Sequence, residues 1–174
     1  MGDRLAMKSS EEHVIYPRPK EITSRPIRLV LPFLVELWNK QLTARVVDFD
    51  RLFGAGQLTR QMAIPGVESE LRNWLQSHSE QKRWDIAGCF LMGYWRGERA
   101  PDRTLIALLL ASLEHDSPTT ENDSVICALG AAYDLCAPEV ASMIRECFRR
   151  LWRPDATYQP AVASSLKHVL CFRD

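Results

Sequence analysis

The chain has 174 residues, of which 46% are hydrophobic and 25% are charged, values typical of a globular protein. Its 22 lysines and arginines balance its 22 aspartates and glutamates, so its formal net charge is zero. Proteins that bind nucleic acid usually carry a strongly basic surface, and we therefore expect no nucleic-acid partner. A chain of this length can bury a core without disulfide bonds and is expected to form one domain.

The five cysteines are expected to be free thiols in a reducing compartment. Their number is odd and each lies within an apolar helical pattern, which is unlike the disulfide framework of a secreted protein. There is no CxxC pair and no zinc-ligand spacing, so we expect no metal site and no cofactor. The longest apolar stretch, Leu105 to Leu110, is far shorter than the roughly 20 residues that a membrane span needs. We therefore expect a cytoplasmic protein with no membrane partner.

Residues 1–25 are polar, contain prolines and show no periodicity, which predicts an extended or mobile N-terminal arm. An alternative is a strap along the domain, anchored by three apolar side chains, Val14, Ile15 and Tyr16. Residues 26–174 are predicted to form a single helical domain. Within it, we expect 26–80 to be an irregular helical cap and 81–172 to carry a repeat.

In the predicted cap, apolar residues spaced by three and four from Val30 onward indicate a helix with Pro32 in its first turn. The pattern weakens between 46 and 64, where Gly54 and Gly56 predict a short helix followed by a loop. A second amphipathic helix follows Pro65.

The second half is more regular and predicts five helices, separated by glycine and proline, at about 81–96, 102–115, 121–136, 138–152 and 158–172. The short junction at Ala137 and Pro138 requires the two helices that it joins to be antiparallel neighbours.

These helices show an internal repeat. A shift of 39 residues aligns Ile86, Phe90, Gly93 and Tyr94 with Val125, Leu129, Ala132 and Tyr133, and a further shift of 37 reaches Val162, Leu166, Val169 and Leu170. A shift of 38 aligns the helices between them, placing Leu105, Ile106, Leu109, Leu110 and Leu113 on Met143, Ile144, Cys147, Phe148 and Leu151.

A unit of two helices with a period near 38 resembles a HEAT-type repeat. The resemblance implies an all-α fold of stacked antiparallel helical hairpins, with about seven to eight helices. Small residues would let the first helices of neighbouring units approach closely, namely Gly88, Gly93, Ala128, Gly130, Ala131 and Ala132. A general helical bundle with helices of similar length is the alternative, because all amphipathic helices share one period.

The sequence predicts no catalytic residue. No histidine is paired at metalloprotease spacing, and no serine lies in a nucleophile elbow. His115, followed by Asp116, is better explained by helix termination than by catalysis. Trp84 and Trp95, with Asp85 and Tyr94 beside them, would line a groove in a HEAT-like DNA glycosylase. The neutral charge favours core packing for them instead.

Charged residues expected to point away from the core form the candidate partner-binding surface: Arg103, Glu114, Asp116, Arg145, Glu146, Arg149, Arg150 and Arg153. The arginines that end one helix also complement its dipole.

A small helical-repeat protein without catalytic groups resembles the immunity proteins that bacteria use against toxins. The resemblance implies a protein that binds and blocks a cognate toxin and is not an enzyme. Alternatives are an adaptor or assembly chaperone and, less favoured, a HEAT-like enzyme such as a DNA glycosylase or cofactor lyase. The sequence makes no prediction about a small-molecule ligand.

Overall fold

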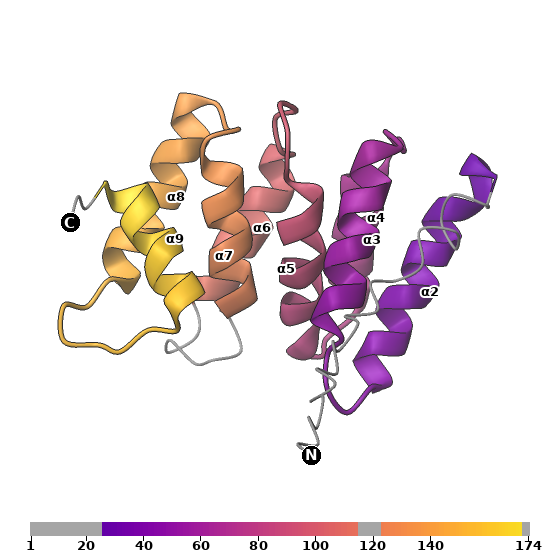
Figure 1. The fold of residues 1–174 in the computed structure, drawn as a ribbon, viewed down its shortest axis with the longest axis horizontal. Helices are drawn as coiled ribbons and strands as arrows, with labels where there is room; N and C mark the ends of the chain where they lie inside the picture. The colour runs from indigo at the N-terminus through magenta and orange to yellow at the C-terminus, as the bar shows by residue number, and fades with distance from the viewer. Residues whose placement is uncertain (1–25, 115–122, 172–174) are drawn as a thin grey trace, which may run out of the picture.

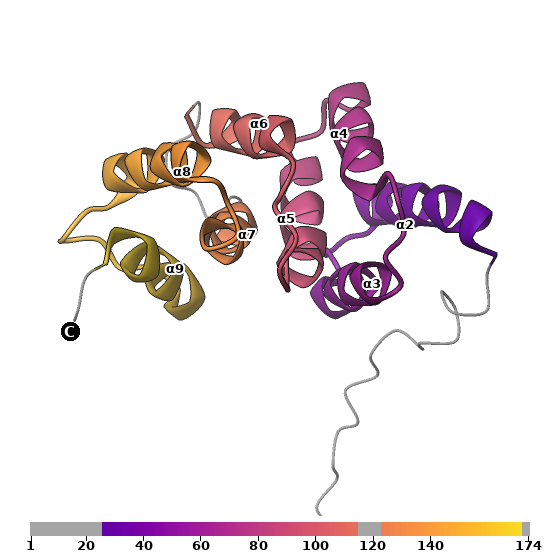
Figure 2. The ribbon, with the colours of Figure 1, turned by 90° about the horizontal axis from the view of Figure 1, so that it is seen from above.

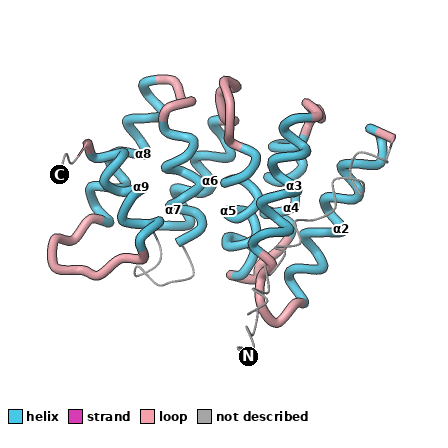
Figure 3. Tube along the Cα trace, in the orientation of Figure 1, coloured by secondary structure: helices cyan, strands magenta, loops and turns pink. Residues whose placement is uncertain are grey.

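A computed structural model describes residues 26–114 and 123–171, and these residues form an all-helical fold (Figure 1). They contain 8 α-helices and no strand, which confirms the predicted all-α class (Figure 3). The predicted arm at 1–25 and the candidate residue Asp116 lie outside the described residues. After a 3-10 turn, η1 (Ile27–Leu29), the helices are α2 (Val30–Thr43), α3 (Phe49–Gln61), α4 (Val67–Ser77), α5 (Lys82–Tyr94), α6 (Arg103–Glu114), α7 (Asp123–Tyr133), α8 (Pro138–Leu151) and α9 (Pro160–Leu170).

The helices lie in two rows, and from α3 onward successive helices alternate between them (Figure 2). Helices α3, α5, α7 and α9 pack side by side, and we call them the inner row. Helices α4, α6 and α8 form the outer row, while α2 packs against α4 and α5 at one end. In the described residues, no helix is both long enough and apolar enough to cross a membrane.

Glycines bring the first two helices of the inner row into backbone contact. A Cβ placed on Gly93 would lie 2.9 Å from the carbonyl carbon of Phe53, and even closer to its oxygen. In the opposite direction, a Cβ on Gly56 would lie 2.9 Å from the amide nitrogen of Tyr94. Real Cβ atoms essentially never approach other atoms so closely, so only glycine permits this separation of α3 and α5.

The next two contacts of the inner row follow the same rule. A Cβ on Gly88 would lie 2.6 Å from the backbone of Ser124 in α7, and one on Gly130 would lie 2.8 Å from Cβ of Ser165 in α9. The prediction that small residues let these helices approach closely is therefore confirmed at Gly88, Gly93 and Gly130.

The structure corrects the prediction for residues 46–64. Instead of a short helix and a loop, Phe49–Gln61 is one continuous helix, α3, which contains Gly54 and Gly56. The Asp48 side chain caps this helix by accepting a hydrogen bond from the amide of Arg51 at 3.1 Å. Each helical glycine costs about 1 kcal/mol against alanine, but packing of α3 against α5 offsets that cost. The region predicted to be only an irregular cap therefore supplies the first helix of the inner row.

The last helix begins two residues later than predicted, because Tyr158 belongs to the connection before α9. Its hydroxyl donates to the carbonyl of Leu151 at 2.9 Å and accepts from the amide of Arg153 at 2.7 Å. Its ring stacks on Trp152, with the ring centroids 5.5 Å apart. Tyr158 thus fastens the connection to the end of α8.

The core runs continuously along both rows. Trp38 is fully buried near one end, with its ring centroid 5.6 Å from that of Trp74 and 5.3 Å from that of Phe90. Trp84 and Trp95 are 8% and 2% exposed, which agrees with core packing and contradicts a groove lined by these two rings.

Candidate protein-binding groove

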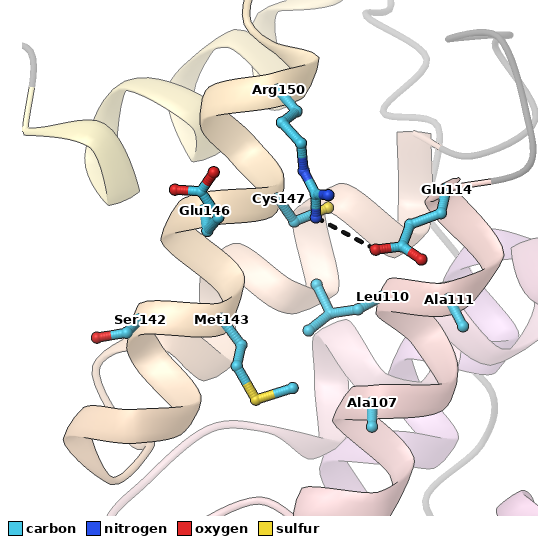
Figure 4. Close-up of a pocket in the computed structure, with 9 residues that line it drawn as sticks. All are labelled: Ala107, Leu110, Ala111, Glu114, Ser142, Met143, Glu146, Cys147 and Arg150. Atoms are coloured by element: carbon cyan, nitrogen blue, oxygen red, sulfur yellow. Dashed lines mark hydrogen bonds and ion pairs between the residues drawn. The ribbon is translucent and has the colours of Figure 1, made fainter.

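A groove lies between α6 and α8 in the outer row, as its lining residues show (Figure 4). Its volume is about 440 Å³. We call it the α6–α8 groove and define it by its lining residues, Ala107, Leu110, Ala111, Glu114, Ser142, Met143, Glu146, Cys147 and Arg150. The lining positions are spaced by three and four along each helix, so each helix contributes one continuous face.

The apolar part of the groove comes from Leu110, Met143 and Cys147. Leu110 and Cys147 are buried, whereas Met143 is 38% exposed. On the α6 side of the groove, Ala107 and Ala111 are small and exposed, so their side chains project only a short distance from the helix. The groove therefore offers apolar surface to anything that enters it.

Two ion pairs border this apolar surface. Arg150 Nη2 lies 3.2 Å from Glu114 Oε1 and joins α8 to α6 across the groove (Figure 4). Arg149 Nη1 lies 3.6 Å from Glu146 Oε2, three residues earlier on α8. All four side chains are more than half exposed. An exposed ion pair contributes only about 0–1 kcal/mol to stability, so a partner's charged side chain can replace one member of either pair at little cost.

Three of the predicted partner-binding residues line this groove, namely Glu114, Glu146 and Arg150. Arg149 lies beside it through its ion pair with Glu146. Arg103 is the first residue of α6 and lies one helical turn before Ala107, on the same face of that helix.

Two other predicted residues lie elsewhere. Arg145 is half-buried and belongs to a contact with α7, where it donates to the Tyr133 hydroxyl and its guanidinium carbon lies 5.4 Å from the centre of that ring. Arg153 follows the end of α8 and is exposed. The structure thus divides the predicted set between the groove and its surroundings.

The apolar centre of the groove was not predicted from the sequence, because Leu110, Met143 and Cys147 all fit the core pattern of their helices. The repeat places Met143 at the position of Leu105, which is fully buried. Equivalent positions therefore differ in exposure, and the usable signal was a methionine where the preceding unit has leucine.

A second hollow, of about 300 Å³, lies between the start of α4 and the connection before α6, and it is lined in part by Glu68, Tyr94 and Asp102. Glu68 accepts hydrogen bonds from the Trp95 indole at 3.4 Å and from the backbone amide of Asp102. Burial is the main cause that raises the pKa of Glu68, and hydrogen bonds partly oppose it. Asp102 in turn caps α6 by accepting from the amide of Leu105 at 2.8 Å. These groups hold the connection in place, and a structural role accounts for them.

Burial also sets the pKa values of two cysteine thiols, Cys89 and Cys136. It raises the pKa of Cys89 to about 12 and that of Cys136 to about 11. A thiol with such a pKa is almost entirely protonated at neutral pH and is a poor nucleophile. Among the described residues, no group of three or more histidine, cysteine, aspartate or glutamate side chains is placed to hold a metal ion.

Comparisons of the chain with protein-family models, curated proteins and solved structures gave no match.

Proposed function

We propose that this chain is a protein-binding module that engages its partner through the α6–α8 groove. The observation that carries the proposal is Met143, a large apolar side chain left 38% exposed above a buried apolar floor and bordered by ion pairs. Protein interfaces combine an apolar centre with a polar rim, and methionine and arginine are enriched in them. Methionine also adapts its shape to a partner's surface.

Within this class, we propose an immunity-type protein that binds a toxin and blocks it in the cytoplasm. Support comes from the small size, the helical architecture and the absence of a catalytic motif in the sequence, which the chain shares with small toxin-immunity proteins, and from the charged rim of the groove. Complementary charges at a rim speed association and discriminate between partners, which are the properties that a toxin inhibitor needs. An adaptor or assembly chaperone would use the same groove and is the alternative within the class.

The proposal is tested by expressing the chain together with the product of the neighbouring reading frame. We expect that product to be toxic alone, harmless in the presence of this chain, and to form a complex on a sizing column. Met143→Ala is expected to raise the Kd of the complex by about tenfold or more, the effect of losing a central apolar contact. Val46→Ala is the matched control, because Val46 is an exposed apolar residue outside the groove.

Each part of the proposal has its own contradicting result. A neighbouring product that is harmless alone would contradict the immunity assignment. A complex with equal affinity for wild type and Met143→Ala would contradict the groove as the binding surface. Tight binding of duplex DNA at low salt, with a steep loss of affinity as salt is added, would favour a DNA-directed enzyme instead.

A further inference from the structure

The α6–α8 groove lies between two helices that start at the same end of the molecule (Figure 1). Each wall presents side chains at intervals of one helical turn, Ala107 and Ala111 on one side and Met143 and Glu146 on the other. A third helix fits such a surface by placing its side chains between those of the walls. Because Ala107 and Ala111 have small side chains, the backbone of the partner helix can approach α6 closely.

An extended partner segment fits this groove poorly. Every lining residue belongs to α6 or α8, where the backbone N–H and C=O groups of a helix interior are already paired with one another. A strand entering the groove would find no backbone partners and would leave its own polar groups without hydrogen bonds. A helix brings its backbone already paired and contributes only side chains.

The charges of the groove define which helix fits. Three charged residues line it, and two of them, Glu114 and Glu146, are acidic. The one cation, Arg150, pairs with Glu114 at 3.2 Å, whereas Glu146 pairs with Arg149 at the longer distance of 3.6 Å. Glu146 lies one turn from Met143, and its pair with Arg149 is exposed and weak. A partner cation that arrives next to an apolar side chain can therefore replace Arg149 at Glu146.

We infer that the groove receives an amphipathic helix of the partner, which inserts one large apolar side chain against Met143 and Leu110 and places a lysine or arginine one turn away against Glu146. This inference rests on the proposed function and names the chemistry of the segment that is bound. The apolar side chain supplies most of the affinity, and the cation sets the register of the helix in the groove.

A displayed library of helical peptides, randomised along one face and panned on the purified full-length chain, tests the inference. Enriched peptides are expected to carry a large apolar residue with lysine or arginine three or four positions away. Their Kd is expected to rise about tenfold for Met143→Ala and about three- to tenfold for Glu146→Lys. Panning on the Glu146→Lys variant is expected to select aspartate or glutamate at the position of the cation.

Glu36→Lys is the matched control, because Glu36 is an exposed carboxylate on α2, outside the groove. Circular dichroism checks that each variant is folded. Absence of any enriched peptide, peptides that bind Met143→Ala as well as wild type, or peptides that Glu146→Lys and Glu36→Lys weaken equally would overturn the inference.

Failure of the inference and failure of the proposed function remain distinguishable. If the complex formed on co-expression depends on Met143 while the peptides show no preference for a cation, the inference is overturned and the proposed function is not. If that complex is indifferent to Met143→Ala, the groove is not the binding surface and both are overturned.

Discussion

Gly93→Ala should destabilise the protein, although alanine is the better helix former. A Cβ at this position would lie 2.9 Å from the carbonyl carbon of Phe53 and 3.1 Å from the amide nitrogen of Gln57. Both are backbone atoms, so no side-chain rotation relieves the contact and α3 must move away from α5. Overpacking costs about 1–3 kcal/mol, and a backbone contact belongs at the upper end of that range. The gain in helix propensity returns about 1 kcal/mol. We therefore expect a net loss of about 2 kcal/mol.

The assay is chemical denaturation, together with a thermal melt. A loss of about 2 kcal/mol lowers the Tm of a chain of this size by about 4–8 °C. Ser164→Ala is the control, since Ser164 is exposed in α9 and alanine there should leave stability unchanged or slightly higher. In Gly130→Ala the nearest atom would be Cβ of Ser165 at 2.8 Å, a longer approach than the one Gly93→Ala makes to the carbonyl oxygen of Phe53, so this substitution should cost less. The double variant Gly56→Ala/Gly93→Ala should lose less stability than the sum of the two single variants, because either substitution alone already moves α3 away from α5.

The reasoning is refuted if Gly93→Ala is more stable than wild type by about 1 kcal/mol, the amount that helix propensity alone predicts. Exact additivity with Gly56→Ala would also contradict a shared contact between α3 and α5.

Three further predictions concern other parts of the fold. Burial raises the pKa of Cys89 from the ordinary thiol value of 9.0 to about 12, so its contribution to stability is complete below pH 9 and is lost as the pH rises from 9 to 12. Cys89→Ala should flatten this fall in denaturation curves, and an unchanged slope would contradict the assigned pKa. Tyr158→Phe should cost about 1 kcal/mol and speed amide exchange in residues 152–159, with no change elsewhere. A chain that ends at Pro154 lacks α9 and should aggregate or lose cooperative unfolding; a soluble, cooperative product would argue against stacking.

The inner row was predictable because its signals are local. The spacing of Ile86, Phe90 and their counterparts marks one buried face per helix, and that face alone predicts which side packs inward. The glycines within these helices were a further signal, because their cost to the helix needs a compensating contact. Gly88, Gly93 and Gly130 all have such a contact.

The same type of residue misled the prediction at α3. Gly54 and Gly56 act as breakers when only their neighbours in sequence are considered. The compensating contact is made by Gly56 with α5, more than thirty residues later. Local propensity therefore gave a loop where tertiary packing gives a helix.

The candidate groove was predictable only at its rim. Glu114, Glu146 and Arg150 are polar residues on apolar helices and were expected on the surface. The exposure of Met143 depends on how far α6 lies from α8, which no local pattern reports. The contact of Arg145 with Tyr133 likewise depends on how α8 folds back along α7.

The central claim is that α6 and α8 together bind a protein partner, and hydrogen exchange read by mass spectrometry tests it most directly. The sample is the complex with the product of the neighbouring reading frame, compared with the free chain. We predict slower amide exchange in α6 and α8 on binding and unchanged exchange in α2. Protection confined to α2 and α3, or no complex at all, would contradict the claim.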